Sequence, residues 1–138
     1  MYVNMDVAYS YTNKAAMVLL FNQGKILSVS RKNDHSKKGL PGGKVDEGET
    51  FLKAAARECY EETGLEAFCL IPVFGRIAKG EMDFCAIVYL AQWKGEIHKT
   101  SEKESGLVEW TTWEELKTGP FGEYNQELYN HLVNVGLI

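Results

Sequence analysis

Three glutamates lie close together near the end of one predicted helix. In the stretch GKVDEGETFLKAAARECYEETGL (43–65), Glu58, Glu61 and Glu62 are spaced i, i+3 and i+4. Like charges at this spacing repel each other, and acids at the C-terminal end of a helix also oppose its dipole. We therefore expect a positive partner, and carboxylate oxygens are ligands that the hard cations Mg²⁺ and Mn²⁺ prefer. The alternative is a solvated acidic face that nearby basic residues compensate in part.

The helix that carries these acids is predicted at residues 50–63. Thr50 can cap its first turn, and Gly64 can end it in the left-handed conformation. Glu62 is the acid nearest to the apolar stripe, so this group should lie at the margin of the buried face. The predicted stripe consists of Leu52, Ala55, Ala56 and Cys59.

The loop before the helix contains a stiff residue followed by two glycines, Leu-Pro-Gly-Gly at 40–43. Glycines permit unusual backbone angles and the close approach of a ligand or metal to main-chain atoms. The carbonyl of Gly43 is therefore a candidate for an additional metal ligand. Taken alone, however, such a segment is most often only a turn.

These residues together resemble the Nudix box, G-x5-E-x7-R-E-U-x-E-E-x-G-U. Every fixed position and every spacing is matched, by Gly43, Glu49, Arg57, Glu58, Glu61, Glu62 and Gly64. Cys59 is the one soft departure, at a position where the family has a bulky aliphatic residue. The order of strands and helices also resembles the Nudix fold over nearly the whole chain. The resemblance implies an α/β (α+β) protein with a mixed β-sheet sandwiched between helices.

The resemblance further implies Mg²⁺-dependent hydrolysis of a nucleoside diphosphate linked to another moiety, by attack of water on phosphorus. Carried over by position, the metal ligands are Glu58, Glu61 and Glu62 with the carbonyl of Gly43. Either Glu58 or Glu61 is the expected general base. Mn²⁺ is the expected substitute for Mg²⁺, and the expected partner is a small nucleotide.

Arg57 and Glu49 resemble the family's orienting pair, in which Arg57 bridges back to Glu49 and fixes the geometry of the loop and the helix. From the residues alone, Arg57 can also form an i→i+4 pair with Glu61. A further metal-binding acid is expected from a later loop, where Glu104 resembles the placement in MutT-like members. Glu102 competes for this role, and both can equally be solvated loop acids.

Features outside the box narrow the substrate by elimination. Pro72 follows Leu65 by only seven residues, which is too near for the ADP-ribose group. The stretch KGEMDF lacks the tyrosine of many dinucleoside polyphosphate members, and the coenzyme A signature is absent. The chain therefore most resembles MutT-like hydrolases that convert a nucleoside triphosphate, including oxidised purines such as 8-oxo-dGTP, into a monophosphate and pyrophosphate. The alternatives are an ADP-sugar or dinucleoside polyphosphate hydrolase, or a nucleotide-binding regulator that does not hydrolyse.

Two residues are candidates for direct substrate contact. Arg31, at the start of a predicted polar loop (31–39), is the preferred phosphate contact. Asn125, at the start of the last helix, resembles the MutT-like residue that reads the purine edge, although an asparagine there can also simply cap the helix. The aromatic residues that can stack on a base, or belong to the core, are Tyr124, Phe121 and Phe84.

The remaining elements follow from hydrophobic periodicity and turn residues. A tight turn at Asn22-Gln23-Gly24 should join two strands, and Thr112 should cap a short helix by a capping box with Glu115. Leu128, Leu132 and Val135 should form the buried face of the last helix. The predicted strands are 15–21, 25–30, 69–77 (an edge strand broken by Pro72), 82–93 (long and buried), 96–99 and 107–111, and the last helix is 124–136.

Length and composition limit the number of domains, the kinds of partner and the cellular compartment. The chain has 138 residues, 45% of them hydrophobic, and we expect one domain, 1–138. A net charge of −4 gives no basic field for a nucleic acid polymer or an acidic membrane. The longest apolar run, AAMVLLF, is too short to span a bilayer, and no signal peptide is expected. Three cysteines without a CxxC pair indicate a reducing compartment, so we expect a cytoplasmic protein. The sequence leaves the oligomeric state open, a homodimer included.

Overall fold

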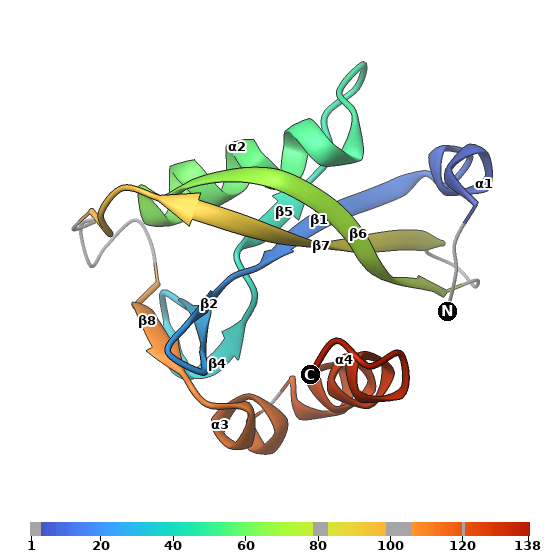
Figure 1. The fold of residues 1–138 in the computed structure, drawn as a ribbon. Helices are drawn as coiled ribbons and strands as arrows, with labels where there is room; N and C mark the ends of the chain where they lie inside the picture. Colours follow the sequence, from blue (N-terminus) through green and yellow to red (C-terminus); the bar gives the residue numbers. More distant parts are fainter. Residues whose placement is uncertain (1–3, 79–82, 99–105, 120) are drawn as a thin grey trace.

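The computed structural model describes residues 4–78, 83–98, 106–119 and 121–138. Within these ranges the chain forms eight strands and four helices (Figure 1). In chain order the elements are α1 (Met5–Tyr9), β1 (Asn13–Leu19), β2 (Phe21–Asn22), β3 (Lys25–Arg31), β4 (Asp34–Gly39), β5 (Gly42–Lys44), α2 (Phe51–Thr63), β6 (Glu66–Ala78), β7 (Phe84–Lys94), β8 (Val108–Thr111), α3 (Trp113–Thr118) and α4 (Gly122–Asn134). None of the helices described is long and apolar enough to cross a membrane.

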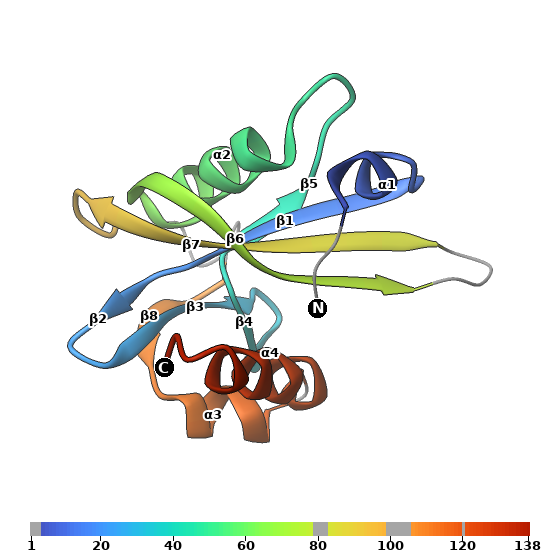
Figure 2. The same ribbon diagram turned by 45° about the vertical axis from the view of Figure 1, so that its right-hand side comes forward.

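The central sheet is mixed and has the strand order β5-β1-β7-β6. β1 and β7 are parallel, whereas β5 and β6 pair antiparallel to their neighbours. α2 lies on one face of this sheet, and α3 and α4 lie on the other side (Figures 1 and 2). The predicted mixed sheet between helices is therefore confirmed. The prediction was incomplete, because β2, β3, β4 and β8 form a second sheet around β3.

The first turn shows why the chain divides into two sheets. Gln23 and Gly24 both have positive φ, 52° and 79°, as the type I′ hairpin turn requires. The predicted hairpin is thus confirmed, but its first strand is only Phe21–Asn22. The apolar run 15–21 is shared between β1 of the central sheet and β2 of the second sheet.

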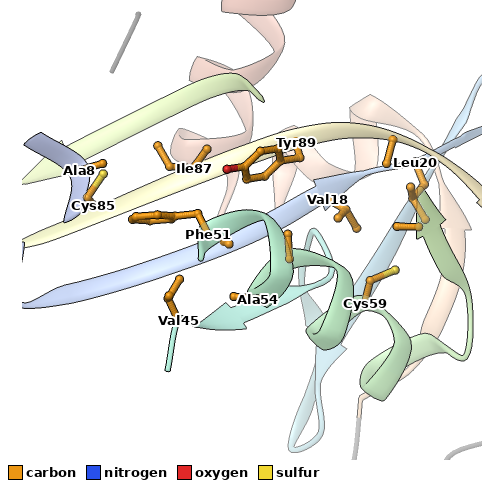
Figure 3. Packing of buried hydrophobic residues seen from close by; sticks show 14 of the residues in the cluster. Ala8, Val18, Leu20, Val45, Phe51, Ala54, Cys59, Cys85, Ile87 and Tyr89 are labelled. Atoms are coloured by element: carbon orange, nitrogen blue, oxygen red, sulfur yellow. The ribbon is translucent and has the colours of Figure 1, made fainter. Parts of the chain in front are cut away.

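The helix α2 has the ends that the sequence predicts. The Thr50 hydroxyl accepts a hydrogen bond from the Lys53 amide at 3.1 Å, and Gly64 ends the helix at φ 84°. The predicted stripe is shifted, because Leu52 is 43% exposed. The buried residues are Phe51, Ala54, Ala55, Cys59 and Thr63. Two adjacent residues compete for the core, and the larger Phe51 takes it, packed edge-on to Tyr9 and facing the central sheet (Figure 3).

Three further predictions need correction. The polar stretch 31–39 is not only a loop, because Asp34–Gly39 forms β4 and pairs with β3. No strand forms at 96–98, and Lys99 lies outside the described residues. Val135 is 54% exposed, so the buried face of α4 is set by Leu128 and Leu132. A hydrogen-bonded strand that faces solvent on both sides has no apolar pattern, which explains the first of these errors.

The two long strands agree with the sequence. β7 is buried over most of its length, and β6 is an edge strand. Pro72 lies within β6, where the register with β7 shifts on both sides of it. Proline lacks an amide hydrogen and is tolerated at such an edge.

Candidate active site

Arg57 is the hub of the candidate site. Its Nε and Nη2 donate to the two carboxylate oxygens of Glu49 at 2.8 and 2.9 Å. Its Nη1 donates to Glu58 at 3.0 Å and to Glu61 at 3.3 Å, and its Nη2 also donates to the carbonyl of Lys44 at 3.1 Å. The bridge to Glu49 and the i→i+4 pair with Glu61 therefore exist together. This guanidinium ties the loop after β5 to the last turns of α2.

The charges around this guanidinium do not balance. Asp46 also approaches Arg57, at 3.4 Å, so that one positive group faces four carboxylates: Asp46, Glu49, Glu58 and Glu61. Hydrogen bonds from Arg57 lower the pKa of Glu49, and the carboxylates in turn raise the already high pKa of Arg57. Arg57 thus offsets the repulsion along α2 only in part, and an excess of negative charge remains.

Gly43 lets Glu58 lie directly against the sheet. A Cβ atom at Gly43 would come within 2.7 Å of the carboxyl carbon of Glu58, closer than two such carbons can approach. Any other residue here would push this carboxylate away from the strand. The glycine therefore places Glu58 beside the main chain of β5, as a ligand role for the Gly43 carbonyl requires.

Glu62 occupies the other side of the glycine pair. Its carboxylate accepts a hydrogen bond from the Gly42 amide at 2.8 Å. The pKa of Glu62 is raised to about 7, mainly by burial. The hydrogen bond from Gly42 opposes this rise, and the negative charges of Glu58 and Glu61 add to it. No role for Gly42 follows from the sequence alone, although paired glycines are a signal for main-chain contacts.

The donor set fits a hard divalent cation. Glu58 and Glu61 both lie within hydrogen-bonding distance of one nitrogen of Arg57, and Glu62 and Glu58 flank the consecutive residues Gly42 and Gly43. All of these donors are carboxylate or carbonyl oxygens, which Mg²⁺ and Mn²⁺ prefer. In the described part of the chain, no three acidic, histidine or cysteine side chains converge on one point. A bound cation would therefore have to compete with Arg57 for these oxygens.

A cavity of about 330 Å³ adjoins this group. Glu62, Gly42, Gly43 and Arg31 all line it, and the Arg31 guanidinium lies over the ring of Phe121 at 5.6 Å. The structure thus brings the predicted phosphate contact to the same cavity as Glu62, one of the predicted metal ligands. Its full lining is Met17, Val29, Ser30, Arg31, Lys37, Gly39, Leu40, Gly42, Gly43, Glu62 and Phe121.

Asn125 lies elsewhere. It is 1% exposed, does not line this cavity, and donates from Nδ2 to the carbonyl of Leu116 at 2.9 Å. The expectation that it caps the helix is wrong, because α4 has Phe121 at its N-cap without a side-chain cap bond. Its neighbour Tyr124 packs edge-on to Phe74, with its hydroxyl buried. Glu102 and Glu104 fall within 99–105, outside the described residues.

Comparison with known proteins gives the same picture. The family model of the NUDIX domain matches residues 11–132. The chain is 47% identical over 57 residues to the "Putative 8-oxo-dGTP diphosphatase" of Bacillus subtilis (strain 168), a match over 41% of this chain and 38% of that protein. It is 33% identical over 103 residues to the "MutT-like protein" of Streptomyces ambofaciens, over 73% of this chain and 64% of that protein. The chain thus spans less than two thirds of the length of either relative.

The fold is shared with solved structures. The MutT NUDIX hydrolase from Burkholderia pseudomallei superposes with a TM-score of 0.73 at 24% identity, over 87% of this chain and 97% of that one. The E. coli ORF135 protein superposes with a TM-score of 0.68 at 22% identity, over 87% and 89% of the two chains. At such identities the likeness concerns the fold.

Proposed function

Because this chain belongs to the NUDIX family, we propose that it hydrolyses nucleoside diphosphates linked to another group, with nucleoside triphosphates as substrates. Oxidised purine triphosphates such as 8-oxo-dGTP are included, a choice supported by the description of the Bacillus subtilis relative. A water oxygen attacks phosphorus, one phosphoanhydride P–O bond breaks, and pyrophosphate leaves with the bonding electron pair. The observation that carries the proposal is the excess of carboxylates around Arg57, next to a cavity that contains Arg31.

The carboxylates of Glu58, Glu61 and Glu62 and the carbonyl of Gly43 would hold Mg²⁺, with Mn²⁺ as a substitute. When bound, such a cation would neutralise phosphate charge and make water in the site more acidic. Burial is the main cause of the raised pKa of Glu62, and repulsion from Glu58 and Glu61 adds to it. Binding a cation therefore relieves an unfavourable arrangement that folding has already imposed.

Individual side chains of the protein have the remaining roles in the proposed reaction. Glu58 or Glu61 takes the proton of the attacking water, because both reach the same side of Arg57. Arg57 and Glu49 orient this pair through their forked, two-bond contact. Arg31, which lines the same cavity as Glu62, contacts the phosphates. The three cysteines are free thiols, which is consistent with a cytoplasmic enzyme.

A substrate panel with Mg²⁺ tests the proposal. Nucleoside triphosphates, 8-oxo-dGTP, ADP-ribose and a dinucleoside polyphosphate are compared, with pyrophosphate and phosphate release measured separately. We expect turnover of triphosphates with pyrophosphate as the product. Cleavage of ADP-ribose or of the dinucleotide without turnover of any triphosphate would overturn the substrate assignment. Binding without turnover across the panel would identify a regulator instead.

A matched pair of variants tests the cavity. Arg31→Gln removes the phosphate contact, and we expect KM to rise by about tenfold or more, because hydrogen bonds to charged groups contribute roughly 1.5–3 kcal/mol. Lys32→Gln is the control, since Lys32 is the exposed neighbour and does not line the cavity. Equal effects of the two substitutions would show that only general surface charge matters.

A further inference from the structure

Arg31 is held differently from the other two arginines of the chain. Arg57 donates hydrogen bonds to three carboxylates. Arg76, although it also lies over a tyrosine ring, pairs with Glu127 at 3.4 Å. Arg31 forms no ion pair with any residue that the structure describes, and its guanidinium carbon lies 5.6 Å from the centroid of the Phe121 ring. An aromatic ring therefore takes the place that carboxylates have beside the other two arginines.

A ring attracts a guanidinium without using its hydrogen-bond donors. The negative face of an aromatic ring attracts a cation electrostatically, whereas a carboxylate would accept the N–H groups and compete with a phosphate for them. A guanidinium has five such donors in a fixed fork that matches phosphate oxygens. Those of Arg31 have no acceptor among the described residues. The contact with Phe121 thus locates this guanidinium and leaves it available for an anion.

The main chain beside Arg31 is held on both sides. Ser30, directly before it, pairs with Lys38 of β4. On the other side the Ser30 amide donates to the carbonyl of Leu107 at 3.0 Å, and the Ser30 hydroxyl accepts from the Leu107 amide at 2.8 Å. The register with β4 shifts between Ser30 and Arg31, and such irregularities redirect side chains, commonly beside active sites. The backbone is therefore fixed, whereas the long, exposed side chain of Arg31 depends on a contact at its far end.

The main chain that carries the ring is fixed as well. Phe121 is the N-cap residue of α4, and its carbonyl accepts the amide of Asn125 at 3.1 Å. The next residue, Gly122, is buried, and a Cβ atom there would collide with the carbonyl of Lys117 near the end of α3. The close contact between α3 and α4 at this point therefore requires glycine. Phe121 extends from this tight junction and lines the same cavity as Arg31.

We propose that Phe121 is a positioning residue whose ring holds the Arg31 guanidinium at the cavity, where the guanidinium binds the phosphates of the substrate. This role rests on the proposed function and adds to it a residue that acts through Arg31. An exposed arginine side chain loses rotamer freedom when it binds an anion. The contact with Phe121 removes part of this loss before the phosphate arrives. The alternative role of Phe121, stacking on the nucleobase, would not require Arg31.

Inorganic pyrophosphate, the proposed product, separates the two roles because it has phosphates but no base. We would measure its Kd by isothermal titration calorimetry with millimolar Mg²⁺, for the parent protein and for Phe121→Leu. We expect the Kd to rise about 3- to 30-fold, since a cation–π contact of a half-buried ring contributes about that factor. Phe121→Trp restores an aromatic face and should restore the parental Kd. Phe68→Leu is the matched control, because it removes a ring that lies under Lys94 at 5.8 Å, outside the cavity.

A double-mutant cycle tests whether the ring acts through Arg31. In Arg31→Gln, the further change Phe121→Leu should leave the pyrophosphate Kd unchanged, because no guanidinium remains to be held. A trifluorinated phenylalanine at position 121 keeps the shape of the ring but reduces the negative charge of its face, so it should weaken binding only when Arg31 is present. This variant also decides the case in which Phe121→Leu does not fold. In turnover assays with triphosphates, Phe121→Leu should raise KM and leave kcat unchanged, because the lost interaction is one of binding.

The outcomes separate the positioning role from the proposed function. If triphosphates are hydrolysed but the parent protein does not bind pyrophosphate, or Phe121→Leu leaves its Kd unchanged or raises it equally without Arg31, the positioning role is overturned and the function stands. If Phe121→Leu weakens binding of the triphosphate but not of pyrophosphate, the ring stacks on the base and the positioning role is also overturned. If no nucleotide is hydrolysed but the cycle couples Phe121 to Arg31, the positioning role stands and hydrolysis is overturned.

Discussion

Two ionic clusters in this protein are built in opposite ways. The Arg57 cluster consists of Arg57 with Asp46, Glu49, Glu58 and Glu61, all within residues 46–61. The Lys38 corner consists of Lys38, Glu109, Glu115 and Asn125, which come from β4, β8, α3 and α4. The first cluster is local in the chain, whereas the second exists only because distant segments meet.

The clusters also differ in charge balance. In the Lys38 corner one ammonium faces two carboxylates, Glu109 at 2.6 Å and Glu115 at 3.1 Å, and Thr111 donates a further hydrogen bond to Glu115 at 2.8 Å. These contacts join β4, β8 and α3. The Arg57 cluster has four carboxylates for one cation and lies beside a cavity. The locally encoded cluster thus keeps an excess of negative charge, whereas the assembled corner holds elements together.

The largest effect should come from removing acids of the Arg57 cluster. Glu58→Gln and Glu61→Gln should each lower turnover of triphosphates by at least about a hundredfold, as loss of general-base or metal-ligand function does. The melting temperature should not fall, because like-charge repulsion on α2 is relieved. Turnover assays and circular dichroism measure the two effects. Glu114→Gln, at an exposed side chain of α3, should keep parental activity. Near-parental turnover in both site variants would remove Glu58 and Glu61 from the mechanism.

Changing the geometry of the Arg57 side chain while keeping its positive charge should have the next largest effect. Arg57→Lys keeps a positive charge but loses the fork to Glu49, and residues that orient metal ligands typically matter by 10- to 100-fold. We expect kcat to fall by about that factor. Arg76→Lys makes the same substitution in the surface pair with Glu127 and should leave kcat unchanged. A parental kcat in Arg57→Lys would show that charge alone suffices at this position.

In the Lys38 corner a substitution should act on stability. Asn125→Ala leaves the carbonyl of Leu116 unpaired in a buried position, which should lower the free energy of unfolding by about 1–3 kcal/mol. Urea denaturation measures this, with Asn130→Ala on the exposed face of the same helix as the control. Unchanged stability with a raised KM would instead support the expectation that Asn125 contacts the base.

The smallest effect should come from the cation itself. Mg²⁺ or Mn²⁺ at tenfold its Kd should stabilise the folded protein by about 1.4 kcal/mol by mass action, which raises the melting temperature by a few degrees. Thermal melts with and without millimolar metal test this in the absence of substrate. The double variant Glu58→Gln/Glu61→Gln should lose most of the shift. An unchanged melting curve for the parent protein would contradict the metal role of this cluster.

Much of the candidate site could be predicted because its determinants lie within a single loop and helix. The spacing of Glu58, Glu61 and Glu62, the cap at Thr50 and the left-handed Gly64 all depend on helix geometry over one or two turns. The resemblance to the Nudix box rests on the same local residues. Even the bridge from Arg57 to Glu49 spans only eight positions.

The errors share a different cause. Periodicity did not distinguish Phe51 from Leu52 as the residue that packs on the sheet, and it did not show that Asp34–Gly39 pairs with β3. It also gave no reason to place Asn125 between α3 and β4. Each of these outcomes depends on contacts between segments far apart in the chain, which compete for the same partners.

The sequence by itself therefore determined the chemistry of the acidic cluster, because short-range helix and loop geometry brings its carboxylates together in any compact arrangement of the chain. Only the tertiary structure decided what lies next to that cluster. Arg31 reaches the cavity beside Glu62 through the second sheet, and Phe121 reaches the same cavity from the start of α4. The physical reason is that strand register is fixed by packing across the whole domain, whereas helix spacing is fixed by the backbone of a few consecutive residues.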